Sequence, residues 1–383
     1  MAARWENDLD RWIKNGVIDA AAAARIRAFE QSHETALGFR WPVLLTVAFG
    51  ALLLAAGALL FVAAHWDALS PGFRFTLVAL LVALFHVGAA LATDRFPVLA
   101  TALHVVGTVC LGGGIFLAGQ IFNLQEHWPG GILLWAIGAW IAFGLLRDWP
   151  QAALAALLTP FWLAGEWIEA TRYFIGGALI LAEGALLLSI TYLSARLPGQ
   201  ESAIRKALVW IGALAALPLA VWVGAGSESV WNRTTMPGIY FAAGWAGALL
   251  LPLLVAWRLR GLAAWLNLVA ALWVVALGST GFGSDHYTFL GGPSWHQLGP
   301  YVMWMIGSLG MIGWGLHEAR KERINLGVAG FALTVLGFYF STVIDKLGRS
   351  ASLIGLGLLF LLGGWLLEKA RRRLVQQLES AKS

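Results

Sequence analysis

The chain has 383 residues, of which 59% are hydrophobic and only 12% are charged. Soluble domains carry about 25% charged residues, so this composition excludes an ordinary soluble protein and indicates a membrane protein. The single cysteine, Cys110, excludes an intrachain disulfide and any zinc or iron–sulfur site built from several cysteines of this chain.

Residues 1–41 are predicted to form a short cytoplasmic amphipathic helical hairpin. Apolar residues recur at helical spacing on one face: Trp5, Leu9, Trp12 and Ile13. Gly16 is suited to end the first helix, and Asp19 is suited to cap the second. Two interpretations stay open: the hairpin lies on its own membrane domain, or it docks a second membrane protein.

The transmembrane domain is predicted to occupy residues 42–368, because apolar runs long enough to cross a bilayer follow one another there. A span needs about 20 apolar residues. Twelve runs are found, at residues 43–64, 74–93, 98–121, 130–146, 150–165, 173–194, 207–224, 237–257, 262–279, 299–317, 324–344 and 352–368. The fifth run is short and contains Pro160. Residues 369–383 are predicted to continue the last helix as a basic cytoplasmic tail.

The distribution of positive charge predicts the orientation of these runs. With the N-terminus inside, 21 of the 26 Lys and Arg residues fall in inside segments. The other five fall outside, namely Arg74, Arg172, Arg233, Lys346 and Arg349. Inside loops of membrane proteins are enriched in Lys and Arg. The sequence therefore predicts an all-α polytopic bundle of about twelve spans with both termini in the cytoplasm. Lipid headgroups account for the net charge of +5, so no nucleic-acid partner is needed.

Several segments carry a family resemblance: WIKNGVID at 12–19, FVAAHWD at 61–67, GQIFN at 119–123, LLWA at 133–136, and the close from INLG at 324–327 to GGWLLEKARRRL at 363–374. These segments resemble the bacterial membrane-protein family named domain-of-unknown-function 2157. The resemblance implies a multi-pass protein of the bacterial inner membrane. It also implies a second membrane protein as partner. It supplies no catalytic residues.

Glu183 is the clearest ionisable residue inside a predicted span. It lies about ten residues into the sixth run, roughly 15 Å from either surface at 1.5 Å per residue. Ionisable groups in the bilayer are costly and mark functional sites by default. Glu183 is therefore a candidate proton relay or cation ligand. The alternative is a carboxyl group that hydrogen-bonds to a neighbouring helix.

Two histidines lie at similar depth in consecutive predicted spans, His86 in the second and His104 in the third. They are candidates for a proton-transfer or metal pair. The alternative is a pair of hydrogen bonds between helices. No third ligand is found at that depth, so we expect no metal.

A third candidate site is a polar cluster at the outer ends of the first and third spans. Its members are His65, Asp67, Gln120, Asn123, Glu126 and His127. If those spans pack together, the cluster would bind a cation, an amine or a partner loop. The alternative is ordinary interfacial polarity and helix capping.

No sequence motif for an enzyme or a cofactor is found, so we expect neither. The sequence favours an accessory or scaffold component of a membrane complex. The alternative is a secondary transporter or flippase for a small or lipidic solute, with Glu183 as the coupling carboxyl. An enzyme acting at the outer cluster ranks last.

Overall fold

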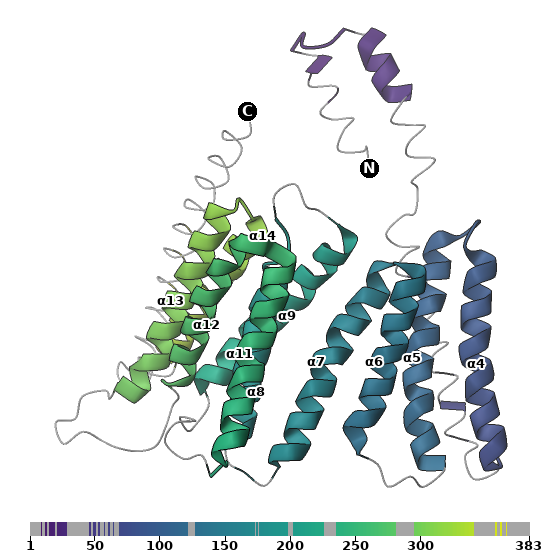
Figure 1. Ribbon diagram of the computed structural model, residues 1–383. Coiled ribbons are helices and arrows are strands. Elements are labelled where there is room, and N and C mark those ends of the chain that lie inside the picture. The colour runs from purple at the N-terminus through teal and green to yellow at the C-terminus, as the bar shows by residue number, and fades with distance from the viewer. Residues whose placement is uncertain are drawn as a thin grey trace. The chain divides into compact units, whose positions relative to one another are not determined.

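In a computed structural model, all elements of regular structure among the described residues are helices (Figure 1). The structure describes residues 69–121, 127–172, 174, 176–197, 202–225, 235–280 and 295–340. It also describes residues 9, 12–13, 15–19 and 21–28, and positions 46, 49, 50, 53, 57, 60, 61, 64, 357, 361 and 365. The predicted all-α class is confirmed. Most of the first and last predicted spans, and the tail at 369–383, lie outside the described residues.

The chain divides into two compact units, residues 1–113 and 114–383. In the first unit, α4 (Pro71–Ala92) is followed by α5 (Pro97–Ile121), within which the boundary falls. The N-terminal segment has the expected local signals. Gly16 adopts a left-handed backbone with φ of 66°, and the Asp19 carboxylate accepts a hydrogen bond of 2.6 Å from the Ala22 amide.

The second unit begins with α6 (Trp128–Leu146), α7 (Trp149–Thr171), α8 (Gly177–Leu193) and α9 (Ala203–Ala225). It continues with α11 (Gly238–Arg260), the short 3₁₀ helix η2 (Gly261–Ala264) and α12 (Trp265–Gly278). Helices α13 (Trp295–His317) and α14 (Lys321–Phe338) complete its described part. The fifth predicted span, 150–165, is thus longer than expected: α7 has 23 residues and contains Pro160.

Three tight turns reverse the chain in the second unit, and each contains one residue with positive φ. These residues are Arg147 at 54°, Gly261 at 58° and Ala319 at 52°. Only glycine adopts this conformation without steric cost. After the first turn, the Asp148 carboxylate caps α7 by accepting from the Gln151 amide at 3.2 Å.

Successive helices of the second unit alternate in direction. The Tyr192 hydroxyl near the end of α8 donates to the Ala156 carbonyl near the start of α7. The Trp304 indole near the start of α13 donates to the Ala220 carbonyl near the end of α9. The turns that carry Arg147, Arg196, Arg260 and Arg323 therefore lie at one end of this unit, which we call the basic end.

Within the described residues, five helical segments are long and apolar enough to cross a membrane by length and composition. They are Pro71–Ala92, Pro97–Gly119, Trp128–Leu146, Ala203–Ala225 and Gly238–Gly278, with Gly177–Leu193 as a shorter apolar helix. The stretch Gly238–Gly278 includes both α11 and α12, which run in opposite directions on either side of Gly261. The structure thus shows several apolar helices of spanning length, and the count of about twelve stays a prediction.

Helices α8 and α9 pack closely against each other at the centre of the second unit. Gly212 of α9 lies directly on the backbone of Ser189 and Leu193 in α8, so that a Cβ at position 212 would overlap them. Around this contact, buried apolar side chains of α8, α9 and α12 form the main core, including Leu186, Leu187 and Val274. The end of α8 is thereby held at the centre of the basic end.

Candidate functional site

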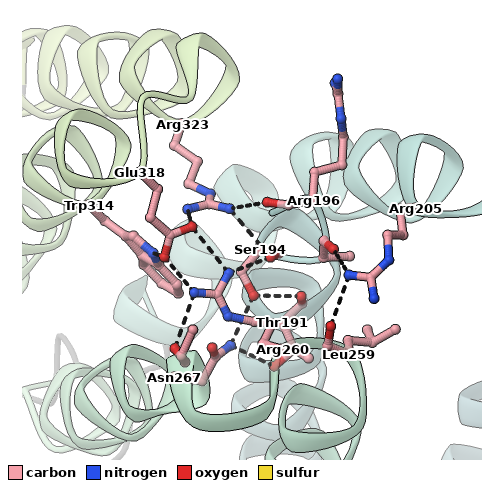
Figure 2. A network of polar contacts seen from close by, with 12 residues as sticks. Thr191, Ser194, Arg196, Arg205, Leu259, Arg260, Asn267, Trp314, Glu318 and Arg323 are labelled. Atoms are coloured by element: carbon pink, nitrogen blue, oxygen red, sulfur yellow. Dashed lines mark hydrogen bonds and ion pairs between the residues drawn. The ribbon is translucent and has the colours of Figure 1, made fainter. Parts of the chain in front are cut away.

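The most elaborate polar arrangement of the described residues lies at the end of α8 (Figure 2). The last carbonyl groups of a helix have no partner within it, and they attract cations. Arg260 from the end of α11 donates to the Ser194 carbonyl at 2.5 Å, and Arg323 from the start of α14 donates to the same oxygen at 3.3 Å. Two guanidinium groups from distant segments thus close the end of α8.

Glu318, in the turn between α13 and α14, neutralises part of this charge. Its carboxylate accepts from Arg260 and from Arg323 at 2.5 Å each, and from the Trp314 indole at 2.7 Å. The side chains of Arg260, Arg323 and Glu318 are 0%, 1% and 9% exposed. Both guanidinium groups also lie about 5 Å from the Trp314 ring centroid, within cation–π range. We call Arg260, Trp314, Glu318 and Arg323 the Arg–Glu cluster.

The electrostatics of Glu318 reflect this environment. Burial raises its pKa, but the hydrogen bonds from Arg260 and Arg323, the charge of Arg323 and the Trp314 hydrogen bond together hold that pKa below its ordinary value. The carboxylate is therefore ionised at neutral pH. A buried ion pair with several hydrogen bonds is stable as a unit but costly to open.

Further polar contacts extend the Arg–Glu cluster to the neighbouring turns. Arg205 at the start of α9 donates to the Ala195 and Leu259 carbonyls at 2.5 and 2.9 Å. Arg196 pairs with Glu322 at 2.5 Å, and the Asn267 amide of α12 donates to Ser194 and Thr191. The space beside Arg196 and Arg323 does not admit even a water-sized ligand. This arrangement therefore joins helix ends and offers no substrate site.

A cavity of about 710 Å³ lies beside the Arg–Glu cluster, between α8, α9, α12, α13 and α14. Its walls are almost entirely apolar and include four indole rings, those of Trp265, Trp273, Trp304 and Trp314. Leu186 and Ile190 of α8 line it, but Glu183 is not among the lining residues. The cavity thus presents hydrocarbon and aromatic surface along most of α13.

Glu183 lies on the same face of α8 as Leu186 and Ile190 but farther from the basic end, where it packs against α12. Its side chain is 2% exposed, its Oε1 atom lies against Gly278, and its Oε2 atom has no hydrogen-bond partner. A Cβ at position 278 would collide with the carboxyl group. The absence of a side chain at Gly278 therefore makes room for Glu183, which is not among the residues that line the cavity.

The predicted histidine pair meets in the first unit. The Nδ1 atoms of His86 in α4 and His104 in α5 are 2.9 Å apart, which is one hydrogen bond between two neutral imidazoles. Gly107 lies under the His86 ring, whose Nε2 would be 2.7 Å from a Cβ at that position. No group of three or more His, Cys, Asp or Glu residues in the described part of the chain could hold a metal ion.

The outer polar cluster is only partly within the described residues. His65, Asp67, Asn123 and Glu126 lie outside them, as does the side chain of Gln120, whose backbone belongs to α5. His127 precedes α6, and its Nε2 atom is 2.6 Å from the carboxylate of Glu166 in α7. The Trp162 indole donates to the same carboxylate at 2.9 Å. Glu166 is thus a partner that the sequence reasoning did not identify.

Sequence reasoning also missed the Arg–Glu cluster, although it assigned Arg260 and Arg323 to inside turns. Glu318 was the available signal, because it is an acidic residue in an otherwise basic turn between two spans. Spacing alone does not show that this turn lies against the end of α8. Only the tertiary structure, which brings the end of α11 and the start of α14 to the end of α8, joins the three charges.

The comparisons with known proteins bear on the N-terminal part. Residues 10–152 match the family model described as "Predicted membrane protein (DUF2157)", which confirms the resemblance found in the sequence. No curated protein and no solved structure matched the chain. The match ends within the first turn of α7, so the Arg–Glu cluster and the cavity lie beyond it. Over residues 10–152, the chain is therefore similar to the DUF2157 predicted membrane proteins.

Proposed function

We propose that the protein is an accessory or scaffold component of a complex in the bacterial inner membrane. The observation that carries this proposal is the Arg–Glu cluster, which fixes the ends of α8, α11 and α14 to one another through buried ion pairs. A scaffold needs such a rigid framework, whereas a transporter needs a packing with two arrangements of similar energy. Opening this end would separate buried charges from the partners that compensate for their burial.

The proposed topology has about twelve spans with both termini in the cytoplasm. It is supported by the position of the basic turns, since Arg147, Arg196, Arg260 and Arg323 lie at one end of the second unit. Positively charged turns favour the cytoplasmic side. In a Cys110→Ala background, cysteines introduced at Ser202 and Ser383 should react with a membrane-impermeant maleimide only after cell lysis. Labelling of either position in intact cells would contradict the topology.

The N-terminal hairpin is the proposed contact with a second membrane protein. Within it, Leu9 and Ala23 are buried, whereas Trp12 and Val17 expose 41% and 68% of their surface. Exposed apolar side chains on a cytoplasmic segment suit a protein interface. At native expression in mild detergent, we expect the protein to migrate on a native gel as an assembly larger than a single 41.2 kDa chain with its bound detergent.

The substitution pair Trp12→Ser and Val17→Ser should release the monomer without changing its melting temperature. Leu91→Ser, which removes a membrane-facing side chain 82% exposed on α4, serves as a control and should leave the assembly intact. A wild-type protein that migrates only as the monomer would contradict the scaffold proposal.

A secondary transporter or flippase with Glu183 as the coupling carboxyl is the second candidate. The observation in its favour is the buried Oε2 atom of Glu183, which has no hydrogen-bond partner. Its separation from the cavity lining argues for a packing role instead. Glu183→Gln keeps the shape and removes the titratable proton. Unchanged solute uptake and growth in that variant would remove the main support for ion coupling.

A further inference from the structure

The cavity beside α13 has the dimensions of a lipid site. It is lined by α13 from Tyr301 to His317, a rise of about 24 Å at 1.5 Å per residue. The hydrocarbon core of a bilayer is about 30 Å thick, so the cavity extends over most of that depth. Its volume of about 710 Å³ lies within the range of roughly 300–1,000 Å³ that is typical of ligand sites. We call it the α13 groove.

The walls of the α13 groove are fixed in place without a ligand. The indole N–H groups of Trp273 and Trp304 donate to the carbonyls of Met303 and Ala220 at 2.8 Å each, and Trp314 donates to Glu318. Because these hydrogen bonds hold the three indole rings in position, the rings do not collapse into the space. The groove is thus preformed, which lowers the entropic cost of binding.

Two glycines of α13 keep the groove open. Among the described residues, nothing lies within 4 Å of a Cβ placed on Gly310 or Gly313, although both line the cavity. Gly307, one turn earlier, instead lies against the Trp273 ring. A side chain at position 310 or 313 would therefore fill the groove without displacing any neighbour.

The apolar lining and the positive charge at one end of the α13 groove determine which kind of ligand it can bind. A polar solute would lose its hydrogen bonds to water in this apolar space, whereas a hydrocarbon chain loses nothing. At the basic end the groove reaches His317, which is exposed, and the exposed Lys321 follows in the next turn. The ion pairs and capping contacts at this end involve four arginines and two glutamates, namely Arg196, Arg205, Arg260, Arg323, Glu318 and Glu322. Positive charge is therefore in excess at this end of the groove.

From this complementarity we propose that the α13 groove binds one anionic phospholipid of the surrounding bilayer. An acyl chain lies along α13 past Gly310 and Gly313, and the phosphate lies at the His317 end. Positive residues at a membrane surface attract anionic headgroups, and the apolar groove holds the chain. This site does not depend on the proposed scaffold role, which rests on other residues.

Photolabelling tests the proposal on the full chain in nanodiscs of phosphatidylglycerol and phosphatidylethanolamine. Either lipid is added in trace amount with a diazirine in the acyl chain, and labelled peptides are mapped by mass spectrometry. We expect labelling concentrated on α13 and α14, stronger for phosphatidylglycerol. The double variant Gly310→Leu and Gly313→Leu should reduce it several-fold. Gly247→Leu is the matched control, because Gly247 on α11 also has open space around it but does not line the groove.

A second variant tests the headgroup separately. His317→Glu should abolish the preference for phosphatidylglycerol while total labelling of α13 and α14 persists. Labelling spread evenly over all lipid-exposed helices, or unchanged by the leucine pair, would overturn the proposal.

The competing occupant is the last predicted span, residues 352–368. In a Cys110→Ala background, a cysteine at Gly310 is paired in turn with cysteines through that segment. Near-complete disulfide formation in native membranes would show that the chain itself fills the groove, and this too would overturn the proposal.

Discussion

Removing the charge of Glu318 should destabilise the second unit more than any comparable change at its surface. Glu318→Gln keeps the side-chain shape but leaves the guanidinium groups of Arg260 and Arg323, which are 0% and 1% exposed, without their counter-charge. The glutamine amide also directs an N–H group at one of the two arginines. Breaking a buried ion pair by removing one partner costs about 3–5 kcal/mol. We therefore expect the free energy of unfolding to fall by about that amount.

The matched control is Glu322, which lies in the first turn of α14 and pairs with Arg196. Arg196 and Glu322 are also 2.5 Å apart, but their side chains are 17% and 39% exposed. Exposed pairs contribute about 0–1 kcal/mol, so Glu322→Gln should lower the free energy of unfolding only slightly. The comparison thus sets a buried carboxylate with two arginine partners against a more exposed one that pairs with Arg196 at the same distance.

The measurement is unfolding of the purified protein by titration with SDS in mixed micelles, followed by far-UV circular dichroism. Replacing Arg260, Glu318 and Arg323 together by Met, Leu and Met should recover much of the loss, since an apolar isostere of a buried triad is often neutral. Equal losses for Glu318→Gln and Glu322→Gln would refute the reasoning, because they would mean that the cluster is solvated.

Three further predictions follow from other contacts. The lowered pKa of Glu318 stabilises the folded protein at pH values above 4.5, the ordinary pKa of glutamate, and this stability is lost as the pH falls through the folded-state pKa. Below pH 4.5, the melting temperature of the wild type should therefore fall more steeply with pH than that of Glu318→Gln. Gly212→Ala should cost about 1–3 kcal/mol by SDS titration, because its Cβ meets backbone, whereas Gly247→Ala should cost nothing. His104→Leu should cost about 1–3 kcal/mol by leaving the His86 ring nitrogen unpaired, and adding His86→Leu should recover part of that loss; a double variant no better than the single one would contradict the assigned hydrogen bond.

The positions of the helices followed from the sequence because their determinants are local. A helix forms its backbone hydrogen bonds within one segment, and a membrane demands this of every span. Apolar length therefore located α4, α6 and α11 to within a few residues. α7 was predicted too short, at 150–165, whereas the helix runs from Trp149 to Thr171 and continues through Pro160.

Depth along a span was also readable, and it placed His86 and His104 at one level before the structure joined them. Depth does not give the rotation of a helix about its axis. Only packing showed that Glu183 lies against Gly278 and is not among the residues that line the cavity. In the same way, His127 was identified as polar and outer, while its partner Glu166 came from a segment 39 residues away.

What the sequence by itself determined was the membrane class, the helices and the sign of charge at their ends. Tertiary structure alone decided which charges pair and where the bundle stays open. Arg260 and Glu318 are 58 residues apart, and their pairing depends on how α11 and α13 pack on α8. The α13 groove exists because Gly310 and Gly313 face a space that no side chain of the described residues fills. Both features are products of packing between helices, which depends on several segments at once and leaves no signal in any one of them.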